Sequence, residues 1–264
     1  MSAILVLSLI SIGTSMAIVQ VKNVIKRYRL GDQDVTALND VSLSIEPGVF
    51  LAIAGPSGSG KSTLLNVIGC IDTPTSGSVF INGQDVSGQT PDALADLRAR
   101  TIGFIFQTFN LLPVLSAEEN VEYPLLQLPE LSKADRQKRV KHYLAMVGLR
   151  KYATHRPNQL SGGQRQRVAI ARALATHSKI VLADEPTANL DRKTGENILR
   201  LMKQINRESE TTFVFSTHDR RVMNMADRLV RIEDGEIKAL GVRKDDGWVF
   251  VQDRRDQGDE DPEV

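Results

Sequence analysis

The sequence predicts an α/β fold with an antiparallel β region near its N-terminus and a small helical insert near its middle. Short apolar runs, typical of buried strands, recur at residues 50–54, 102–106, 180–183 and 212–216. Segments with helical character separate these runs. The first run leads directly into a glycine-rich loop, residues 55–62, which a helix follows.

This loop matches the phosphate-binding pattern G-x-x-x-x-G-K-[ST]. Its glycines let the backbone pass close to a phosphate, while backbone N–H groups and the helix N-terminus favour an anion. Lys61 can reach the β- and γ-phosphates of a nucleotide, and the Ser62 hydroxyl can coordinate Mg²⁺. The predicted nucleotide-binding residues of this segment are Gly55, Pro56, Ser57, Gly58, Ser59, Gly60, Lys61, Ser62 and Thr63.

Two half-buried strands are predicted before the loop, because residues 18–22 and 41–45 alternate between apolar and polar side chains. Tyr28 lies between them in a basic stretch. An exposed aromatic ring here could stack on a purine, whereas a tyrosine at a strand end could equally belong to the core. The residues alone leave both interpretations open.

Three further elements are predicted between the loop and the insert. Residues 78–86 indicate a hairpin, because Asn82-Gly83 suits a tight primed turn. Residues 91–100 favour a helix. The strand that follows ends at Gln107, a polar residue at the edge where ligands bind in open α/β sheets.

The helical insert is predicted from the absence of strand signals over residues 108–160. Ser116, followed by two glutamates, indicates the start of a short helix, which Pro124 should end. Ser132 indicates the start of a longer helix, and Gly148 is typical of its C-terminal end.

After the insert, a helix is expected over residues 164–175 and a closing hairpin over residues 228–240. The strand between them that begins at residue 180 ends in Asp184 and Glu185. A buried strand rarely ends in two adjacent acids for packing reasons, because desolvating charge is unfavourable. We therefore predict that these carboxylates are functional. The next strand leads to His218.

Both ends of the chain differ from the domain between them. Residues 3–12 are apolar, but no basic residue precedes them as in a secretory signal, and a membrane span needs about 20 residues. Met16 directly precedes the first predicted strand, so we expect it to be the natural start. Residues 248–251 are expected to form an edge strand within an acid-rich tail whose last residues are disordered. The expected division is a non-native or disordered extension over 1–16, a domain over 17–241 and the tail over 242–264.

Composition places the chain among ordinary globular proteins, with 264 residues, 41% hydrophobic and 25% charged. The net charge of +1 argues against nucleic acid as a partner. The single cysteine, Cys70, excludes an internal disulfide, and we expect it to be buried. His142, His155 and His177 match no motif, and we expect them at the surface.

The motifs of the second half resemble those of ATP-binding cassette (ABC) ATPases. Leu160-Ser161-Gly162-Gly163-Gln164 is identical to the signature motif of that family. Residues 183–187, 188–191 and 216–219 resemble its Walker B, D-loop and H-loop, in the family's order. The resemblance covers residues 28–235 and implies the ABC-ATPase form of the P-loop NTPase fold. It places the core in 17–106 and 166–241, and the helical subdomain with the signature in 107–165.

The resemblance also implies a homodimer in which each ATP lies between two copies. One copy would contribute the phosphate-binding loop, and Tyr28 of that copy would stack on adenine. Asp191 would shape the contact near the other copy's loop. The other copy would contribute Ser161, Gly162, Gly163 and Gln164. A Ser-Gly-Gly turn at a helix start suits this use, because it is a second anion site.

The same resemblance implies roles around Mg²⁺ and the attacking water. Ser62 and Gln107 would contact the metal ion, with Asp184 acting through water. Glu185 would be the general base, and His218 would contact the γ-phosphate and hold the water and Glu185. The implied catalytic residues are Lys61, Gln107, Glu185 and His218.

Within the family, the chain resembles the group of macrolide exporters, lipoprotein-release motors and the cell-division ABC ATPase, through residues 106–113, 117–121 and 184–191. In that group the ATPase drives a separate membrane partner. We therefore expect a peripheral subunit on the cytoplasmic face of the inner membrane, bound to an integral permease and powering lipoprotein release or efflux. Residues 109–113 are the expected docking groove, although they could also simply pack the insert.

Two other classes of ABC ATPase differ from this chain in how their domains are organised. Repair ATPases carry a long coiled coil between the two halves of the core, and here that interval is short. Translation ATPases usually fuse two cassettes, and here there is one. A non-transport ATPase that drives a cell-division or signalling partner is the alternative that the sequence leaves open, since the same motor parts serve either output.

Overall fold

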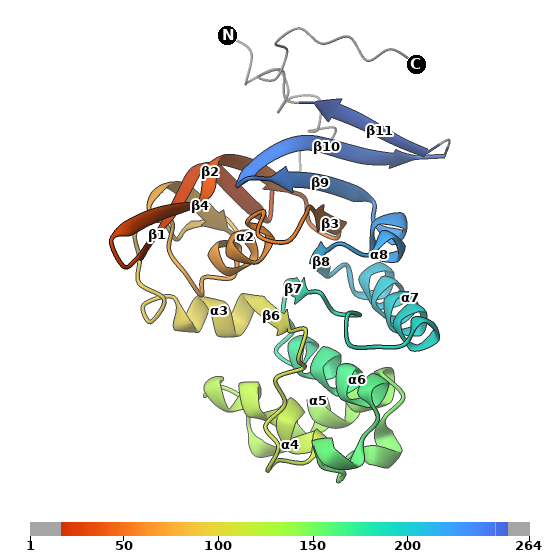
Figure 1. The fold of residues 1–264 in the computed structure, drawn as a ribbon. Coiled ribbons are helices and arrows are strands. Elements are labelled where there is room, and N and C mark those ends of the chain that lie inside the picture. Colours follow the sequence, from red (N-terminus) through yellow and green to blue (C-terminus); the bar gives the residue numbers. More distant parts are fainter. Residues whose placement is uncertain (1–16, 246, 253–264) are drawn as a thin grey trace, which may run out of the picture.

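The computed structural model describes residues 17–245 and 247–252, which form two sheets and a helical region. The four-stranded sheet has the order β2-β1-β4-β5, and the seven-stranded sheet has the order β11-β10-β9-β3-β8-β7-β6. The helices α4, α5 and α6 gather at the end of the molecule away from the four-stranded sheet (Figure 1). This mixed arrangement confirms the predicted fold class.

The four-stranded sheet is antiparallel and contains longer strands than the sequence predicted. Its members are β1 (Val19–Leu30), β2 (Gln33–Ile45), β4 (Ser76–Ile81) and β5 (Gln84–Asp85). The prediction of strands limited to residues 18–22 and 41–45 was wrong, because both continue into a long hairpin with mostly exposed side chains. Tyr28 therefore lies within β1, opposite Val35, and not between two strands.

The predicted Asn82-Gly83 turn is confirmed. Asn82 and Gly83 have φ angles of 49° and 80°, as a primed turn requires, and they connect β4 to β5. The predicted helix at residues 91–100 begins later, at Ala95, because residues 91–94 form turns.

Five parallel strands form the centre of the larger sheet in the order β9-β3-β8-β7-β6. They are β3 (Phe50–Ala54), β6 (Ile102–Ile105), β7 (Ile180–Asp184), β8 (Thr212–Thr217) and β9 (Arg228–Glu233). Their crossovers contain α2 (Lys61–Ile68), α3 (Ala95–Thr101), α7 (Arg192–Ser209) and α8 (Arg220–Met225). Because the strands are parallel, their carboxyl ends meet at one edge.

Two antiparallel strands extend this sheet, β10 (Glu236–Lys244) and β11 (Gly247–Gln252). The predicted closing hairpin and the predicted edge strand are both confirmed. A division between residues 241 and 242 falls inside β10, so the sheet continues into the segment that we assigned to the acid-rich tail. The expectations for residues 1–16 and for the final residues lie outside the described part of the chain.

The helical insert follows the predicted signals closely. Its elements are α4 (Ala117–Glu122), η1 (Tyr123–Gln127), α5 (Lys133–Met146), η2 (Arg150–Tyr152), η3 (Pro157–Gln159) and α6 (Gly162–Leu174). Ser116 and Glu119 form the predicted capping box, Ser132 caps α5, and Gly148 takes the expected left-handed conformation with φ 75°. α6 begins two residues earlier than predicted, because Ser161 is its N-cap.

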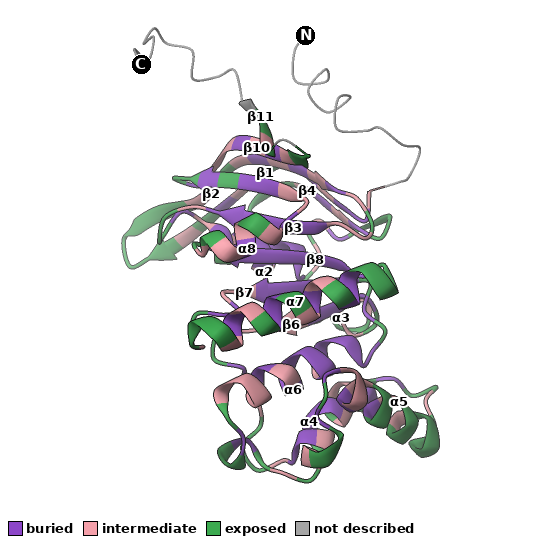
Figure 2. Ribbon diagram, turned by 90° about the vertical axis from the view of Figure 1, so that its right-hand side faces the viewer, coloured by how far each residue is buried: buried purple, intermediate pink, exposed green. Residues whose placement is uncertain are grey.

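Two apolar layers cover the central sheet, whose strands are largely buried (Figure 2). Phe50, Phe213 and Phe215 belong to one layer, with adjacent ring centroids 4.4–5.9 Å apart. Cys70 lies in the other, as predicted, and burial raises the pKa of its thiol to about 11. His142 and His177 are exposed and His155 is half-buried. Within the described ranges, no helix is both long and apolar enough to cross a membrane.

Candidate nucleotide site

The glycine-rich loop connects β3 to α2 through a conformation that glycine permits. Gly58 and Gly60 have φ angles of 80° and 100°, in the left-handed region that side chains disfavour. A Cβ atom on Gly55 would lie 2.0 Å from the carbonyl oxygen of Ile232 in β9. The loop therefore lies directly against β9, and a side chain at position 55 would displace it.

Backbone contacts from the β9–β10 turn brace the other side of the loop. The Gly235 N–H donates to the Ser59 carbonyl at 3.1 Å. A Cβ atom on Gly60 would lie 2.5 Å from the Ala37 carbonyl oxygen of β2. Two regions far from the loop in sequence, β2 and the segment of β9 with its following turn, thus fix the path of the loop.

Lys61, the lysine of the motif, is directed back onto the loop. Its Nζ donates to the carbonyl oxygens of Gly55 and Pro56 at 2.9 and 2.6 Å, and the residue is 8% exposed. A phosphate in the loop would offer this ammonium a charged acceptor, and charge-assisted hydrogen bonds are stronger than those to carbonyls.

The structure brings Ser62 and Asp184 together, two of the residues predicted to hold Mg²⁺. Ser62 Oγ donates to Asp184 Oδ1 at 3.1 Å, and the Ser216 hydroxyl donates to the same oxygen. These hydroxyl and carboxylate oxygens suit Mg²⁺, which usually takes few protein ligands and several from phosphates and water. The described residues contain no cluster of three or more His, Cys, Asp or Glu that could hold a metal by themselves.

Ser216 is a site residue that sequence reasoning missed. Strand register places it there: Asp184 of β7 is paired with Ser216 of β8, and Ser216 is also paired with Ile53 of β3. The sequence signal that could have identified Ser216 is a small polar residue near the end of a fully buried strand.

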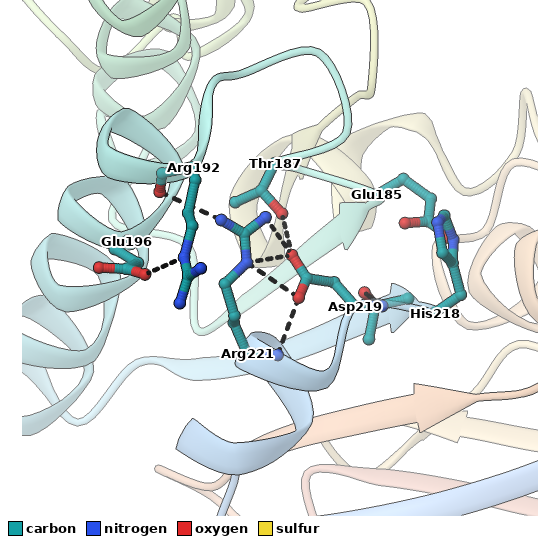
Figure 3. A network of polar contacts seen from close by, with 8 residues as sticks. Glu185, Thr187, Arg192, Glu196, His218, Asp219 and Arg221 are labelled. Carbon is teal, nitrogen blue, oxygen red and sulfur yellow. Dashed lines mark hydrogen bonds and ion pairs between the residues drawn. The ribbon is translucent and has the colours of Figure 1, made fainter.

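Glu185 and His218 form the second predicted pair. His218 Nδ1 and Glu185 Oε1 are 2.7 Å apart, and their side chains are 74% and 16% exposed (Figure 3). Glu185 has φ 45°, a left-handed conformation that is uncommon outside glycine and is enriched at functional sites. Its N–H donates to the Ser216 carbonyl at 3.0 Å, so the backbone turns immediately after β7.

Gln107 and the signature segment are not joined to these pairs by any hydrogen bond in the described chain. Gln107 follows β6, and its carbonyl accepts a hydrogen bond from Asn189 at 2.8 Å. Ser161 and Gln164 cap the start of α6 reciprocally, at 2.8 and 3.3 Å. The signature segment begins α6 in the helical insert, whereas the P-loop lies between the two sheets (Figure 1).

Asp191, the residue predicted to shape the dimer contact, caps the start of α7 by accepting a hydrogen bond from the Thr194 N–H.

Tyr28 lies beside the helix that follows the P-loop. Its hydroxyl donates to Asp72 Oδ2 at 2.8 Å, and Lys26 Nζ lies 4.8 Å from its ring centroid. Lys26 also donates to Asp72 Oδ1 at 2.6 Å. The pKa of Tyr28 is raised by burial and by Asp72, with an opposing contribution from a hydrogen bond to Thr63. Lys26 and Asp72, both missed by sequence reasoning, fix the ring, and one of its faces is occupied by the ammonium.

We expect Tyr28→Ala to raise the Kd for ATP about five- to a hundredfold, since stacking of a base on an aromatic side chain contributes about 1–3 kcal/mol. Tyr28→Phe should retain most of the affinity, because it keeps the ring and loses only the bond to Asp72. Equilibrium titration with a fluorescent ATP analogue measures both. Equal losses in the two variants would contradict a stacking role, and Tyr123→Ala, an exposed tyrosine in the insert, is the control.

Fold and site together define the class: a P-loop nucleotide-binding protein in which the loop, an acidic strand end and a Glu–His pair meet at one sheet edge. The model of the ABC transporter family matches residues 38–188. MJ0796 of Methanocaldococcus jannaschii, an uncharacterized ABC transporter ATP-binding protein, is 49% identical over 223 residues, covering 83% of this chain and 95% of that protein. This chain belongs to the ABC transporter family, and it is an ATPase of the ABC class.

Two further likenesses refine this assignment. A dimeric structure of MJ0796 in a post-hydrolysis state, bound to ADP and Pi, has a TM-score of 0.78 at 48% identity and covers 85% of this chain and 98% of that one. The macrolide export ATP-binding/permease protein MacB of Syntrophobacter fumaroxidans is 48% identical over 224 residues. That match covers 84% of this chain but 31% of MacB, so the chain spans about a third of that relative.

Proposed function

We propose that this chain is the ATP-binding and ATP-hydrolysing motor subunit of a transporter, and that it drives a separate membrane permease. One observation carries the proposal. The P-loop, the Ser62–Asp184 pair and the Glu185–His218 pair all lie at the carboxyl edge of the same parallel strands. This edge is where α/β sheets bind their ligands.

In this proposal the P-loop holds the phosphates of ATP, with Lys61 on the β- and γ-phosphates. Mg²⁺, held by Ser62 and with Asp184 and Gln107 nearby, would neutralise phosphate charge. Glu185 accepts hydrogen bonds from the attacking water and takes its proton as the oxygen approaches phosphorus. His218 orients the carboxylate through the 2.7 Å contact with Glu185 Oε1.

A second copy of the chain would complete each ATP site. The signature segment begins α6 in the insert, and in the described chain no hydrogen bond or ion pair connects it to the P-loop. A Ser-Gly-Gly helix start offers backbone N–H groups to an anion, so it can bind the γ-phosphate held by a partner copy. The dimeric structures of MJ0796 support this arrangement.

The membrane partner is inferred from the MacB relatives, whose printed names combine ATP-binding and permease functions. The matched region covers 31–35% of those proteins. We infer that the subunit is peripheral, on the cytoplasmic face of the inner membrane, and that it powers efflux or lipoprotein release.

The surface that contacts the permease needs a revision from the sequence-based hypothesis. Phe109 is only 8% exposed, and the Arg165 guanidinium lies 5.3 Å from its ring centroid. Leu111 is half-buried against the core. The exposed apolar side chains near this segment are instead Leu112, Val114, Tyr123 and Leu126, at 38%, 72%, 51% and 54%. We propose that these four residues, the insert patch, meet the permease.

Affinity capture tests the proposed function. Tagged Glu185→Gln protein with ATP and Mg²⁺ is incubated with detergent-solubilised membranes, and the proteins recovered are identified by mass spectrometry. An efflux or lipoprotein-release permease would support the proposal. A cell-division or signalling membrane protein would replace transport by the non-transport alternative. Recovery of no membrane protein, with the dimer intact, would contradict a membrane partner.

We expect Val114→Ser combined with Leu126→Ser to reduce this capture at least about tenfold, because two exposed apolar anchors are lost from the proposed contact. Basal ATPase activity should be unchanged, since neither residue contacts the nucleotide site. Leu30→Ser, at an equally exposed position on the β1–β2 hairpin, is the matched control. Capture equal to the parent protein would exclude the insert patch as the contact.

A further inference from the structure

An ion pair between Asp219 and Arg221 lies immediately after His218, at the start of α8. Arg221 Nε is 3.0 and 2.9 Å from the two carboxylate oxygens, and Nη2 is 2.6 Å from Oδ2. The Arg221 backbone N–H also donates to Asp219 Oδ1 at 2.8 Å. Two guanidinium nitrogens therefore contact one carboxylate, a geometry that fixes orientation as well as distance.

This ion pair connects two other segments of the site to the segment that carries His218. Thr187 Oγ1 donates to Asp219 Oδ2 at 3.3 Å, and Thr187 is two residues after Glu185. Arg221 Nη1 donates to the carbonyl oxygen of Arg192 at 3.1 Å, in the first turn of α7. Figure 3 shows the Arg221 guanidinium between Arg192 and the Asp219 carboxylate, with His218 and Glu185 beyond the carboxylate.

The surroundings favour a charged, ordered pair. The guanidinium packs against α7 at Gly195, where a Cβ atom would lie 3.4 Å from Arg221 Nη1, an ordinary contact distance. Burial alone would raise the pKa of Asp219, but hydrogen bonds from Arg221 outweigh it and hold that pKa below its ordinary value.

We propose that Arg221 is a positioning residue for ATP hydrolysis, one that holds the Glu185–His218 pair in place relative to the start of α7. The inference rests on the roles proposed above for Glu185 and His218. Asp219 follows His218 directly, and its carboxylate accepts hydrogen bonds from both the Arg221 guanidinium and the Arg221 backbone N–H, so these contacts fix the segment that carries His218. Loss of the guanidinium would loosen this segment. The 2.7 Å contact between His218 and Glu185 would then lengthen.

The test compares Arg221→Met with Arg220→Met. Arg220 is exposed on the same helix and makes no hydrogen bond or ion pair within the described residues, so its variant is the matched control. We expect Arg221→Met to lower kcat about tenfold or more, since a misplacement of about 1 Å can reduce a rate about 100-fold. KM for ATP should stay within about twofold, because Arg221 contacts no residue of the P-loop. Arg221→Lys should restore part of kcat, because it keeps the charge but not the planar fork.

A double-mutant cycle separates positioning from general stabilisation. In a His218→Ala background, Arg221→Met should cause little further loss of kcat, since the side chain that it positions is already absent. The same fold loss in both backgrounds, or full kcat in Arg221→Met, would overturn the proposal.

A second variant keeps the proposal testable if Arg221→Met does not fold. Asp219→Asn weakens the ion pair, while asparagine can still cap α8. Full kcat in Asp219→Asn would also overturn the proposal. Normal turnover by Glu185→Gln is a different outcome, because it would reject the assignment of the catalytic pair on which this inference rests.

Discussion

Replacing Glu185 with glutamine should lower the rate of ATP hydrolysis about 100- to 10,000-fold, the range typical of a lost general base. The amide keeps the size of the side chain and a hydrogen bond to His218, but it cannot take a proton from water. ATP binding should persist, because Glu185 contacts neither the P-loop nor Tyr28 in the described structure. Phosphate release measures turnover, and nucleotide titration measures binding.

The same variant should accumulate as a dimer with ATP, since the nucleotide that joins the two copies is no longer consumed. Size-exclusion chromatography with multi-angle light scattering, with ATP and without, measures this. Glu208→Gln is the control, because Glu208 lies at the far end of α7 and, among the described residues, accepts a side-chain hydrogen bond only from Gln204. Turnover at the parent rate would remove Glu185 from the role of base.

Replacing Lys61 with alanine should raise the Kd for ATP about ten- to a hundredfold. Hydrogen bonds to charged groups contribute about 1.5–3 kcal/mol, and the buried ammonium is the cation that the motif directs to the phosphates. The same loss should reduce the rise in Tm that saturating ATP produces, because ligand stabilisation follows affinity.

Two controls accompany this prediction. Lys133→Ala removes an exposed lysine from α5, far from the loop, and should bind ATP normally. The Tm of Lys61→Ala without nucleotide shows whether the fold survives the loss of the contacts to Gly55 and Pro56. A folded Lys61→Ala protein with unchanged ATP affinity would contradict the P-loop assignment.

The parts of the site that the sequence predicted are those that short motifs encode. The loop from Gly55 to Ser62 could be predicted from its own residues, because its glycines permit the required backbone conformation and its lysine reaches the phosphates. The acids at the end of β7 stood out because buried strands seldom end in charge. The resemblance to ABC ATPases assigned Ser62 and Asp184 to one Mg²⁺ site, and the structure places their side chains 3.1 Å apart.

What the sequence did not predict depends on contacts between distant segments. Asp72 holds Tyr28 only because the β1–β2 hairpin lies beside the end of α2, and Ser216 holds Asp184 only through strand register. Exposed hairpin residues carry no apolar alternation, so the length of β1 and β2 was underestimated. Phe109 was predicted to face a partner, but it is buried. Loop residues show no regular alternation of apolar and polar side chains, so the sequence gives no signal of which of them are buried.

The bracing of the P-loop by β9 and the β9–β10 turn has a consequence for how the chain is made. The loop leaves the ribosome early, yet the strand and turn that support it lie some 170 residues later. Both strands that pair with β3, β8 and β9, are translated late, so β3 first has two unpaired edges, which invite association with other chains. A nascent chain therefore gains the complete loop only when nearly all of the domain has been synthesised.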